Sequence, residues 1–381
     1  MKVKVKTVQR EKPVIAAGAK MWFARYAPIN LEPKNSIGAK WPRMLDAINL
    51  RPIVEGKRTA IKMHFGGGTG FTTIHPIFIR KLVEAVKAAG AKEVFATDLP
   101  WAVRSGAERG YTPETIGCPM VSATGTSDKY VYRVPVDPPI KDFKEVELAG
   151  EIVDADALID LSHVKGHGAA SFGGASKNLS MGCVSGRTRT ALHSLEGGLE
   201  WDSKKCTRCK ICQENCPNDA IKFTKDGNFE CFYHNCKFCQ HCVLICPKQG
   251  LKMAGGAYET FQQAMATTSS KVLDTFDPKH VLFINFLMNI TIYCDCWGMT
   301  TPNLVPDIGI LASQDIAAIE QATLDLIKHE DLIPGSLPEG LDPRDSGHLF
   351  ERIHGKDPFI LIEHLARLRN GKRTYAMKEV S

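Results

Sequence analysis

The sequence predicts an α/β fold in which a mostly parallel sheet is interrupted by a small α+β module. Three observations support this prediction. A strand, a glycine-rich loop, a helix and a second strand follow one another between Arg58 and Asp98, and a strand followed by a helix recurs between Asp307 and Ile327. Between these two regions, a dense group of cysteines runs from Cys206 to Cys246. The α/β domain is therefore expected to be discontinuous in sequence.

The first region has the pattern of a β-α-β unit. Arg58 to Met63 is short and mostly apolar, and after the sequence HFGGGTG apolar residues recur at helical spacing from Pro76 to Ala89. Proline suits a first helical turn, and Gly90 is placed to end the helix. Glu93 to Thr97 supplies a second strand, which such a unit places parallel to the first. Asp98 is then expected at the carboxyl end of that strand.

Further segments complete the expected order of elements. Ala155 to Leu161 is predicted to be a buried strand that leads into a loop rich in glycine and histidine. Asp307 to Ala312 and Ile316 to Ile327 repeat the strand-then-helix pattern. The proline-rich segment from Pro135 to Pro139 is interpreted as a connection, and Phe359 to Leu368 as a terminal helix.

The length of 381 residues favours a main domain with a smaller module. We expect the α/β domain at residues 1–200 and 253–335, and the inserted module at residues 201–252. A C-terminal extension with the terminal helix is expected at residues 336–381.

Composition and charge exclude several classes of protein. Apolar residues make up 44% of the chain and charged residues 24%, which is typical of soluble globular proteins. The net charge of +6 comes from scattered side chains, so no nucleic acid is expected as a partner. The first residues lack a signal-peptide pattern, and no apolar stretch is long enough to cross a bilayer. We therefore expect a cytoplasmic protein without a membrane span.

The cysteines of the module form two copies of one motif. The sequences CTRCKICQENCP and CKFCQHCVLICP share the same spacing and the same trailing proline. This is the pattern of bacterial ferredoxins, in which each motif serves a four-iron four-sulfur cluster and the fourth cysteine ligates the other cluster. One cluster is expected on Cys206, Cys209, Cys212 and Cys246, and the other on Cys236, Cys239, Cys242 and Cys216. A zinc site is the alternative for a single CxxC pair, and Cys231 is interpreted as a spectator thiol.

The charge of this module suggests its partner. From Cys206 to Gly250 there are six lysines and arginines and four acidic residues. A mildly basic surface suits the docking of an acidic electron carrier such as a ferredoxin or a flavodoxin. The oligomeric state is not predicted.

The loop from Ser162 to Gly186 gathers reactive residue types after a predicted strand, where ligands bind in α/β sheets. Lys177 is a candidate cation or nucleophile, and two glycines allow close approach of a ligand. Turns for the glycines and backbone hydrogen bonds for the histidines are the alternative. The candidate catalytic residues are His163, His167 and Lys177, and the candidate cofactor-binding residues here are Lys165, Gly173, Gly174 and Cys183.

A second group of candidates lies in the sequence CDCWGM. Cys294 and Cys296 could chelate one metal, to which Cys183 could come close in space, or they could be buried structural thiols. An additional metal or small-molecule cofactor is therefore considered. The loop HFGGGTG could cradle an anion on its amides, although it matches neither a Walker loop nor a dinucleotide fingerprint.

Three segments carry a resemblance to a known family. The segments SHVKGHGAASFGGASKNLSMGC at Ser162 to Cys183, FINFLMNITIYCDCW at Phe283 to Trp297, and VPDIGILASQDIAAIEQA at Val305 to Ala322 resemble the domain of unknown function 362 family. Its members often carry ferredoxin-type insertions. The resemblance covers most of the chain from Arg58 to Ile327 and implies no particular activity.

The same glycine loop is distantly similar to the amino-terminal domain of the nickel-pincer lactate racemases. There a histidine, a pair of glycines and a lysine form a comparable pattern. The similarity implies that Lys177 looks like the lysine that tethers the pincer cofactor and His167 like a site histidine. The ferredoxin-type insertion and the CDCW sequence depart from the racemase pattern.

The leading hypothesis is an iron-sulfur oxidoreductase, or a reductase component, in which two clusters relay single electrons to a site on the α/β domain. One alternative is a non-catalytic electron-transfer subunit of a larger redox assembly. Another is a racemase-like metal-cofactor enzyme whose clusters are structural. Substrate, direction of electron flow and cluster potentials are not predicted.

Overall fold

The computed structural model describes residues 18–216, 219–231, 236, 240–253 and 258–380. Cys239, one of the expected cluster ligands, lies outside the described residues, as do the first 17 residues of the expected α/β domain.

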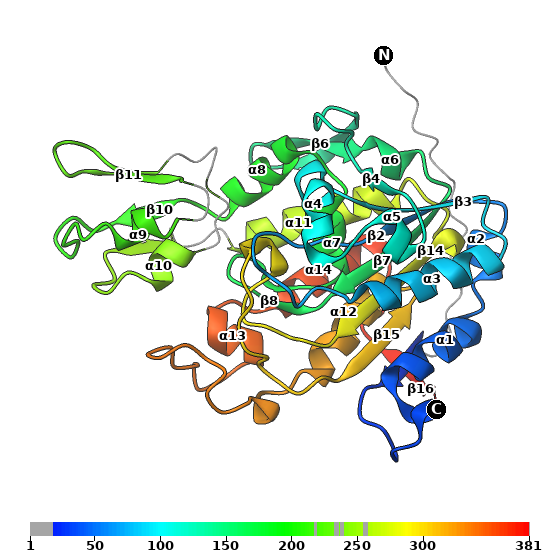
Figure 1. The fold of residues 1–381 in the computed structure, drawn as a ribbon. Coiled ribbons are helices and arrows are strands. Elements are labelled where there is room, and N and C mark those ends of the chain that lie inside the picture. The colour runs from blue at the N-terminus through cyan, green and yellow to red at the C-terminus, as the bar shows by residue number, and fades with distance from the viewer. Residues whose placement is uncertain (1–17, 217–218, 232–235, 237–239, 254–257, 381) are drawn as a thin grey trace.

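One large sheet organises the chain (Figure 1). Its eight strands follow the order β16-β1-β15-β14-β7-β2-β3-β4, and each neighbouring pair is parallel except the two pairs that involve β15. The predicted α/β fold with a mostly parallel sheet is confirmed. The strands are β1 (Ala19–Arg25), β2 (Arg58–Lys62), β3 (Glu93–Asp98), β4 (Met120–Ser122), β7 (Ala157–His163), β14 (Val281–Leu287), β15 (Gly309–Ser313) and β16 (Tyr375–Glu379).

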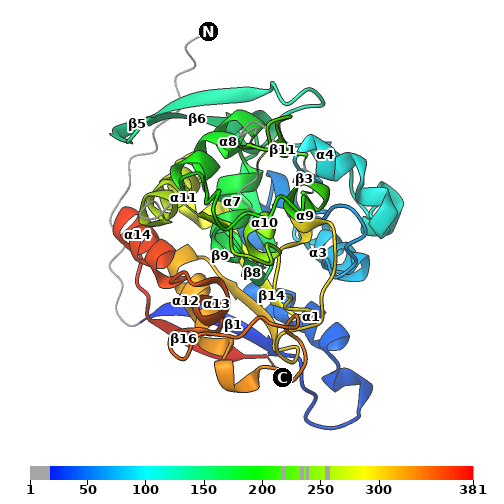
Figure 2. The same ribbon diagram turned by 90° about the vertical axis from the view of Figure 1, so that its left-hand side faces the viewer.

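Helices cover both faces of this sheet (Figure 2), and each face has its own hydrophobic core. On one face lie α7 (Ala175–Gly182), α8 (Gly186–Leu195), α11 (Tyr258–Leu273), α12 (Ile316–Leu326) and α14 (Phe359–Arg369). On the other lie α1 (Ile37–Ile48), α3 (Pro76–Ala88) and α5 (Pro113–Ile116). The short helices α2 (Arg51–Val54), α4 (Pro100–Arg104), α6 (Gly150–Val153) and α13 (Leu349–His354) stand in connections. Strands buried on both faces explain the near-continuous apolar runs of β7 and β14.

The predicted β-α-β unit is present as β2, α3 and β3. Its helix is buried through the apolar residues that recur at helical spacing, Ile79, Leu82, Val83 and Val86. His75 caps the amino end, because its side chain accepts a hydrogen bond from the amide of Ile77. The pairing of β2 with β3 is parallel, as the unit requires.

Three predictions about local structure were wrong. Pro135 to Pro139 is not a connection but part of β5 (Val131–Ile140), which pairs with β6 (Phe143–Ala149) and is irregular where the prolines interrupt the ladder. The segment after β7 is not one loop, because it contains β8 (Lys165–His167), β9 (Ser171–Gly173) and α7. The helix α14 is not terminal, because β16 follows it and pairs with β1.

The cysteine segment forms small elements of its own, between α8 and α11 in the chain. They group at one end of the molecule in Figure 1. Antiparallel pairs join β10 (Leu199–Trp201) to β13 (Leu251–Met253) and β11 (Ile221–Phe223) to β12 (Phe229–Cys231). The one-turn helices α9 (Ile211–Glu214) and α10 (His241–Leu244) each follow a residue in the left-handed conformation, Lys210 and Gln240. The two cysteine motifs therefore share one backbone pattern.

Candidate functional site

A cavity of about 570 Å³ lies at the carboxyl ends of β2, β3 and β7. Ligands of open α/β sheets bind just beyond the carboxyl ends of the parallel strands. Helices α4, α7 and α8, the loop at residues 126–128 and the turn after β14 supply other parts of the wall. The lining residues with reactive or charged groups that are used below are Lys62, His64, Asp98, His163, Lys165, His167, Lys177, Arg189 and Cys296.

Cations outnumber acids on the wall of this cavity. Among the described residues that line it are five lysines and arginines and two aspartates. Lys177 makes no hydrogen bond or ion pair with a described residue, and the Nε atom of Arg189 is buried without a hydrogen-bond partner among them. A recessed site lined mainly by one sign of charge attracts ligands of the opposite sign. The cavity is therefore suited to an anion.

Asp295, the middle residue of the sequence CDC, is held by Lys165 and His163 at the base of the site. It forms an ion pair with Lys165, and its Oδ2 lies 3.0 Å from Nδ1 of His163. The three side chains are buried. Burial alone would raise the pKa of Asp295, but Lys165 and His163 hold it well below its usual range. Asp295 is therefore an anion that fixes the CDC turn to the ends of β7 and β8.

His163 is oriented by the backbone on its other side. Its Nε2 lies 2.8 Å from the carbonyl oxygen of Met288, so this nitrogen donates a hydrogen bond. Nζ of Lys165 lies 2.9 Å from Nδ1 of the same ring. His163 and Lys165, two residues singled out in the sequence, therefore position the turn as well as bordering the cavity.

His64 and Asp98 form a dyad on the cavity wall that the sequence analysis did not combine. Nδ1 of His64 lies 2.7 Å from Oδ2 of Asp98, whose Oδ1 lies 3.1 Å from Nζ of Lys62. Burial lowers the pKa of His64, which keeps the ring neutral. Its Nε2 has no hydrogen-bond partner among the described residues. Because Nδ1 donates to the carboxylate, Nε2 has the free lone pair that a general base needs.

The glycine-rich loop that follows His64 packs against the CDCWG turn. The amide and hydroxyl of Thr69 donate to the carbonyl oxygen of Gly298, at 2.7 and 3.1 Å, and the amide of Phe71 donates to Oγ1 of Thr300. A side chain at Gly68 would collide with the backbone of Gly298. These amides of the loop are therefore engaged with the neighbouring turn.

Burial lowers the pKa of both Lys177 and His167. Burial, followed by the charges of Lys165 and Arg189, lowers the pKa of Lys177 to about 7. Nδ1 of His167 accepts hydrogen bonds from the amides of Ala169 and Ala170, at 3.1 and 2.9 Å. Burial lowers the pKa of His167 well below its usual value, so the ring is neutral.

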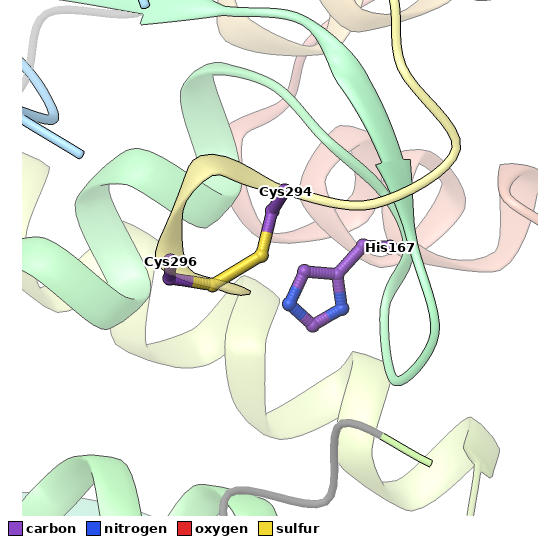
Figure 3. A group of neighbouring side chains, drawn as sticks. All are labelled: His167, Cys294 and Cys296. Atoms are coloured by element: carbon purple, nitrogen blue, oxygen red, sulfur yellow. A yellow bond between two sulfur atoms is a disulfide. The ribbon is translucent and has the colours of Figure 1, made fainter. Parts of the chain in front are cut away.

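Cys294 and Cys296 are joined by a disulfide, and His167 lies beside them. One ligand atom from each of the three residues falls within 4.8 Å of the others. Figure 3 shows the imidazole of His167 directed toward the bonded sulfurs. Cys296 lines the cavity, whereas Cys294 is 1% exposed.

The remaining sequence candidates have different surroundings. Cys183 is fully buried in the hydrophobic core and is not part of the group formed by His167 and the disulfide. Gly174 is the N-cap residue just before α7, where an added Cβ would lie 2.7 Å from the buried carboxylate of Glu320. The Cβ of a substituted Gly173 would lie 3.1 Å from the side chain of Lys177. Glycine at these positions has a packing reason as well as any role in ligand binding.

The cysteine motifs form two groups in space. Cys206, Cys209, Cys212 and Cys246 line one small pocket together with the aromatic rings of Trp201, Phe223 and Phe229. The other group brings Cys216 near Cys236 and Cys242, with Cys231 beside them. A hydrogen bond with Cys236, followed by burial, raises the pKa of Cys231. The sequence analysis gave Cys231 no such position.

The second motif contacts the body beside the disulfide. The rings of His241 and Trp297 lie 4.5 Å apart, and Trp297 also stacks on Tyr293 at 4.0 Å. Nε2 of Gln240 donates to the carbonyl oxygen of Gly168 at 2.6 Å and to Glu196 at 3.1 Å. Gln240 and His241 are therefore anchored next to the cavity.

A family profile described as Domain of unknown function (DUF362) matches residues 59–325, which include the strand ends, the disulfide and the cysteine motifs. The chain belongs to this family. The membership predicted from the three sequence segments is confirmed. None of the helices in the described part of this DUF362 protein combines the length and apolar character needed to cross a bilayer.

Two individual proteins are similar to parts of this DUF362 protein. Pyruvate synthase subunit PorD of Methanocaldococcus jannaschii is 41% identical over 46 residues, which are 12% of this chain. The match covers 54% of PorD, about half its length. The lactate racemase apoprotein from Thermoanaerobacterium thermosaccharolyticum aligns in structure over 73% of this chain and 53% of that one, with 9% identity and a TM-score of 0.34. A likeness at this level carries no argument about chemistry.

The environment of Lys177 predicts that it changes charge near neutral pH. Its amine should become reactive half-maximally near pH 7, far below the usual lysine value of 10.5. The ammonium that attracts anions is therefore lost as the pH rises through about 7. Labelling with an amine-specific reagent across a pH series, followed by peptide mass spectrometry, measures this directly. A pH profile equal to that of exposed lysines in the same digest would contradict the prediction.

Substitution of Asp295 should destabilise the protein. In Asp295→Asn, Lys165 becomes a buried cation without its counter-charge, and loss of one partner from a buried ion pair costs about 3–5 kcal/mol. Adding Lys165→Met should restore part of that loss. Urea unfolding followed by circular dichroism compares the three proteins. The pair is not important for stability if Asp295→Asn unfolds at the same midpoint as the parent.

Proposed function

We propose that this protein is an iron-sulfur oxidoreductase that delivers single electrons, through two four-iron four-sulfur clusters, to an anionic substrate in the cavity. The contact between His241 and Trp297 carries the proposal, because it joins the second cysteine motif to the wall of a cation-lined site. Electron delivery and substrate binding are then adjacent.

The cysteine groups fit the proposed clusters. Cys206, Cys209, Cys212 and Cys246 would hold one cluster, and Cys216, Cys236, Cys239 and Cys242 the other. The amides of Ala220 and Gly250 each lie 3.2 Å from a sulfur, that of Cys216 and that of Cys246. Such N–H donors stabilise the negative charge of cluster thiolates. When bound, the clusters supply electrons one at a time.

The residues of the cavity have separable tasks in this proposal. Lys177 and Arg189 attract and orient the anion, because both present cationic groups without a described partner at the nitrogens discussed above. His64, oriented by Asp98, exchanges a proton at Nε2 with the bound substrate. The recessed site limits access of water to the reacting groups.

A non-catalytic electron-transfer subunit is the second candidate. The likeness to PorD favours it, because that protein is by name a subunit of a larger enzyme. In this case the basic side chains of the cysteine module would dock an acidic ferredoxin or flavodoxin, and the cavity would have no redox role.

Iron analysis tests the cluster assignment. After anaerobic reconstitution, we expect about eight irons and eight acid-labile sulfides per chain. Cys216→Ser should damage chiefly the cluster of Cys236, Cys239 and Cys242, as followed by electron paramagnetic resonance. About four irons per chain, or selective loss of the other cluster's signal, would reject the assignment.

Anion binding separates the enzyme from the carrier. Lys177→Met should leave iron content and cluster reducibility intact, and it should weaken binding of a small polyanion such as citrate or pyrophosphate about tenfold. Lys279→Met is the matched control, since Lys279 is exposed, pairs with Asp277 and does not line the cavity. Calorimetric titration measures both variants. If the parent binds neither anion, or if Lys177→Met binds as the parent does, the carrier is favoured.

A further inference from the structure

The geometry points to Cys294 and Cys296 as a redox-active disulfide, with Cys296 as the sulfur that reacts with a small anionic disulfide in the cavity. In this role the pair collects electrons and returns them to the substrate two at a time. The inference rests on the proposed function for its source of electrons.

The two sulfurs differ in access. Cys296 lines the cavity and is accessible to solvent, whereas Cys294 is 1% exposed. In thiol-disulfide exchange one thiolate attacks the substrate and the second resolves the mixed disulfide. The accessible sulfur of Cys296 suits the first task, and the buried sulfur of Cys294 suits the second. Asp295 between them is fixed by Lys165 and His163, so the turn has a rigid support.

The hydrogen bonds of His167 favour a redox-active disulfide over a metal centre at this position. Two backbone amides donate to its Nδ1, so that nitrogen carries no proton and the neutral ring has its proton on Nε2. A protonated nitrogen cannot ligate a metal, but it can donate a hydrogen bond to a thiolate. Since the ring is directed toward the two sulfurs, it is placed to stabilise the reduced pair (Figure 3).

The pair also lies next to the cysteine module. Trp297 follows Cys296 directly, and its ring contacts His241, the residue before the cluster candidate Cys242. Tyr293 precedes Cys294 and stacks on the same indole with an interplanar angle of 3°. Aromatic side chains therefore flank the CDC turn on the side of the second motif.

The chemistry balances with these residues. Reduction breaks the bond between the two sulfurs and consumes two electrons and two protons, giving two thiols. The electrons come singly from a reduced ferredoxin or flavodoxin docked on the module, through the proposed clusters, and the protons come from solvent. The thiolate of Cys296 then attacks a substrate disulfide, and one half of the substrate leaves as a thiol. Attack by Cys294 on Cys296 re-forms the disulfide and releases the other half. The cationic wall selects an anionic substrate.

An anaerobic reductive titration of the reconstituted protein tests the redox role. With photoreduced deazaflavin as the donor, the parent should accept about four electrons per chain, of which about two belong to the disulfide. Cys294→Ser/Cys296→Ser should accept about two fewer. Alkylation of each sample, followed by mass spectrometry, should find the peptide with both cysteines unlabelled before reduction and doubly labelled after it. This second measurement uses the parent alone, so it holds even if the variant folds poorly.

The outcomes separate this inference from the proposed function. If the cluster signals appear on reduction but the peptide remains a disulfide, the inference fails and the proposed function stands. If the parent never shows cluster signals, both fail. A metal bound at His167, Cys294 and Cys296 in the purified protein would also overturn the redox pair.

The assignment of the attacking sulfur has its own test, with dithiobis(nitrobenzoate) as an anionic disulfide probe. Cys294→Ser should form a mixed disulfide on Cys296, and Cys296→Ser should form none on the buried Cys294. The cationic disulfide cystamine should react with Cys296 at least about tenfold more slowly than the anionic probe. Equal labelling of the two cysteines would overturn their assigned roles, and equal rates for the two probes would overturn the anionic substrate class.

Discussion

The buried ion pair between Asp295 and Lys165 is the interaction on which the arrangement of the site depends. It joins β8, which directly follows β7, to the turn after β14, which lies 130 residues further along the chain. Removing two charges from water costs free energy. The close geometry of the pair and the contact of Asp295 with His163 offset this desolvation cost. The effect of the ion pair is to place Cys296 at the cavity and Trp297 against the cysteine module.

Burial of Lys177 beside other cations makes its proton labile near neutral pH. Burial, followed by the charges of Lys165 and Arg189, lowers the pKa of Lys177 in the recessed volume that these residues share. The charges of Lys165 and Arg189 repel the ammonium group of Lys177. Binding of an anion relieves the repulsion, so ligand affinity and protonation of Lys177 are thermodynamically linked.

The sequence predicted the parts of the fold that are encoded locally. The spacing of apolar residues was enough to predict β2, α3, β3 and β7. The spacing of the cysteines was enough to predict a separate cysteine-rich segment. The strand β16 was missed because it is short and exposed along most of its length, and only its pairing with β1 makes it a strand. The helix α7 was hidden because glycine, serine and alanine dominate it, and burial rather than propensity holds it. The pairing of His64 with Asp98 spans 34 residues and depends on parallel strands ending together, so no local pattern contained it. The site residues chosen from the sequence remain candidates for their proposed roles.

The antiparallel pairing of β10 with β13 brings the two ends of the cysteine segment to one place. Trp201 faces Leu251, so the chain leaves the body and returns to it through adjacent strands. The described strands of the cysteine segment are therefore not part of the large sheet. The strands of the body can therefore pair without any described strand of the cysteine segment. Formation of the body and formation of the cysteine segment are then separable steps of folding, and the hydrogen bond from Gln240 to Gly168 joins the two parts.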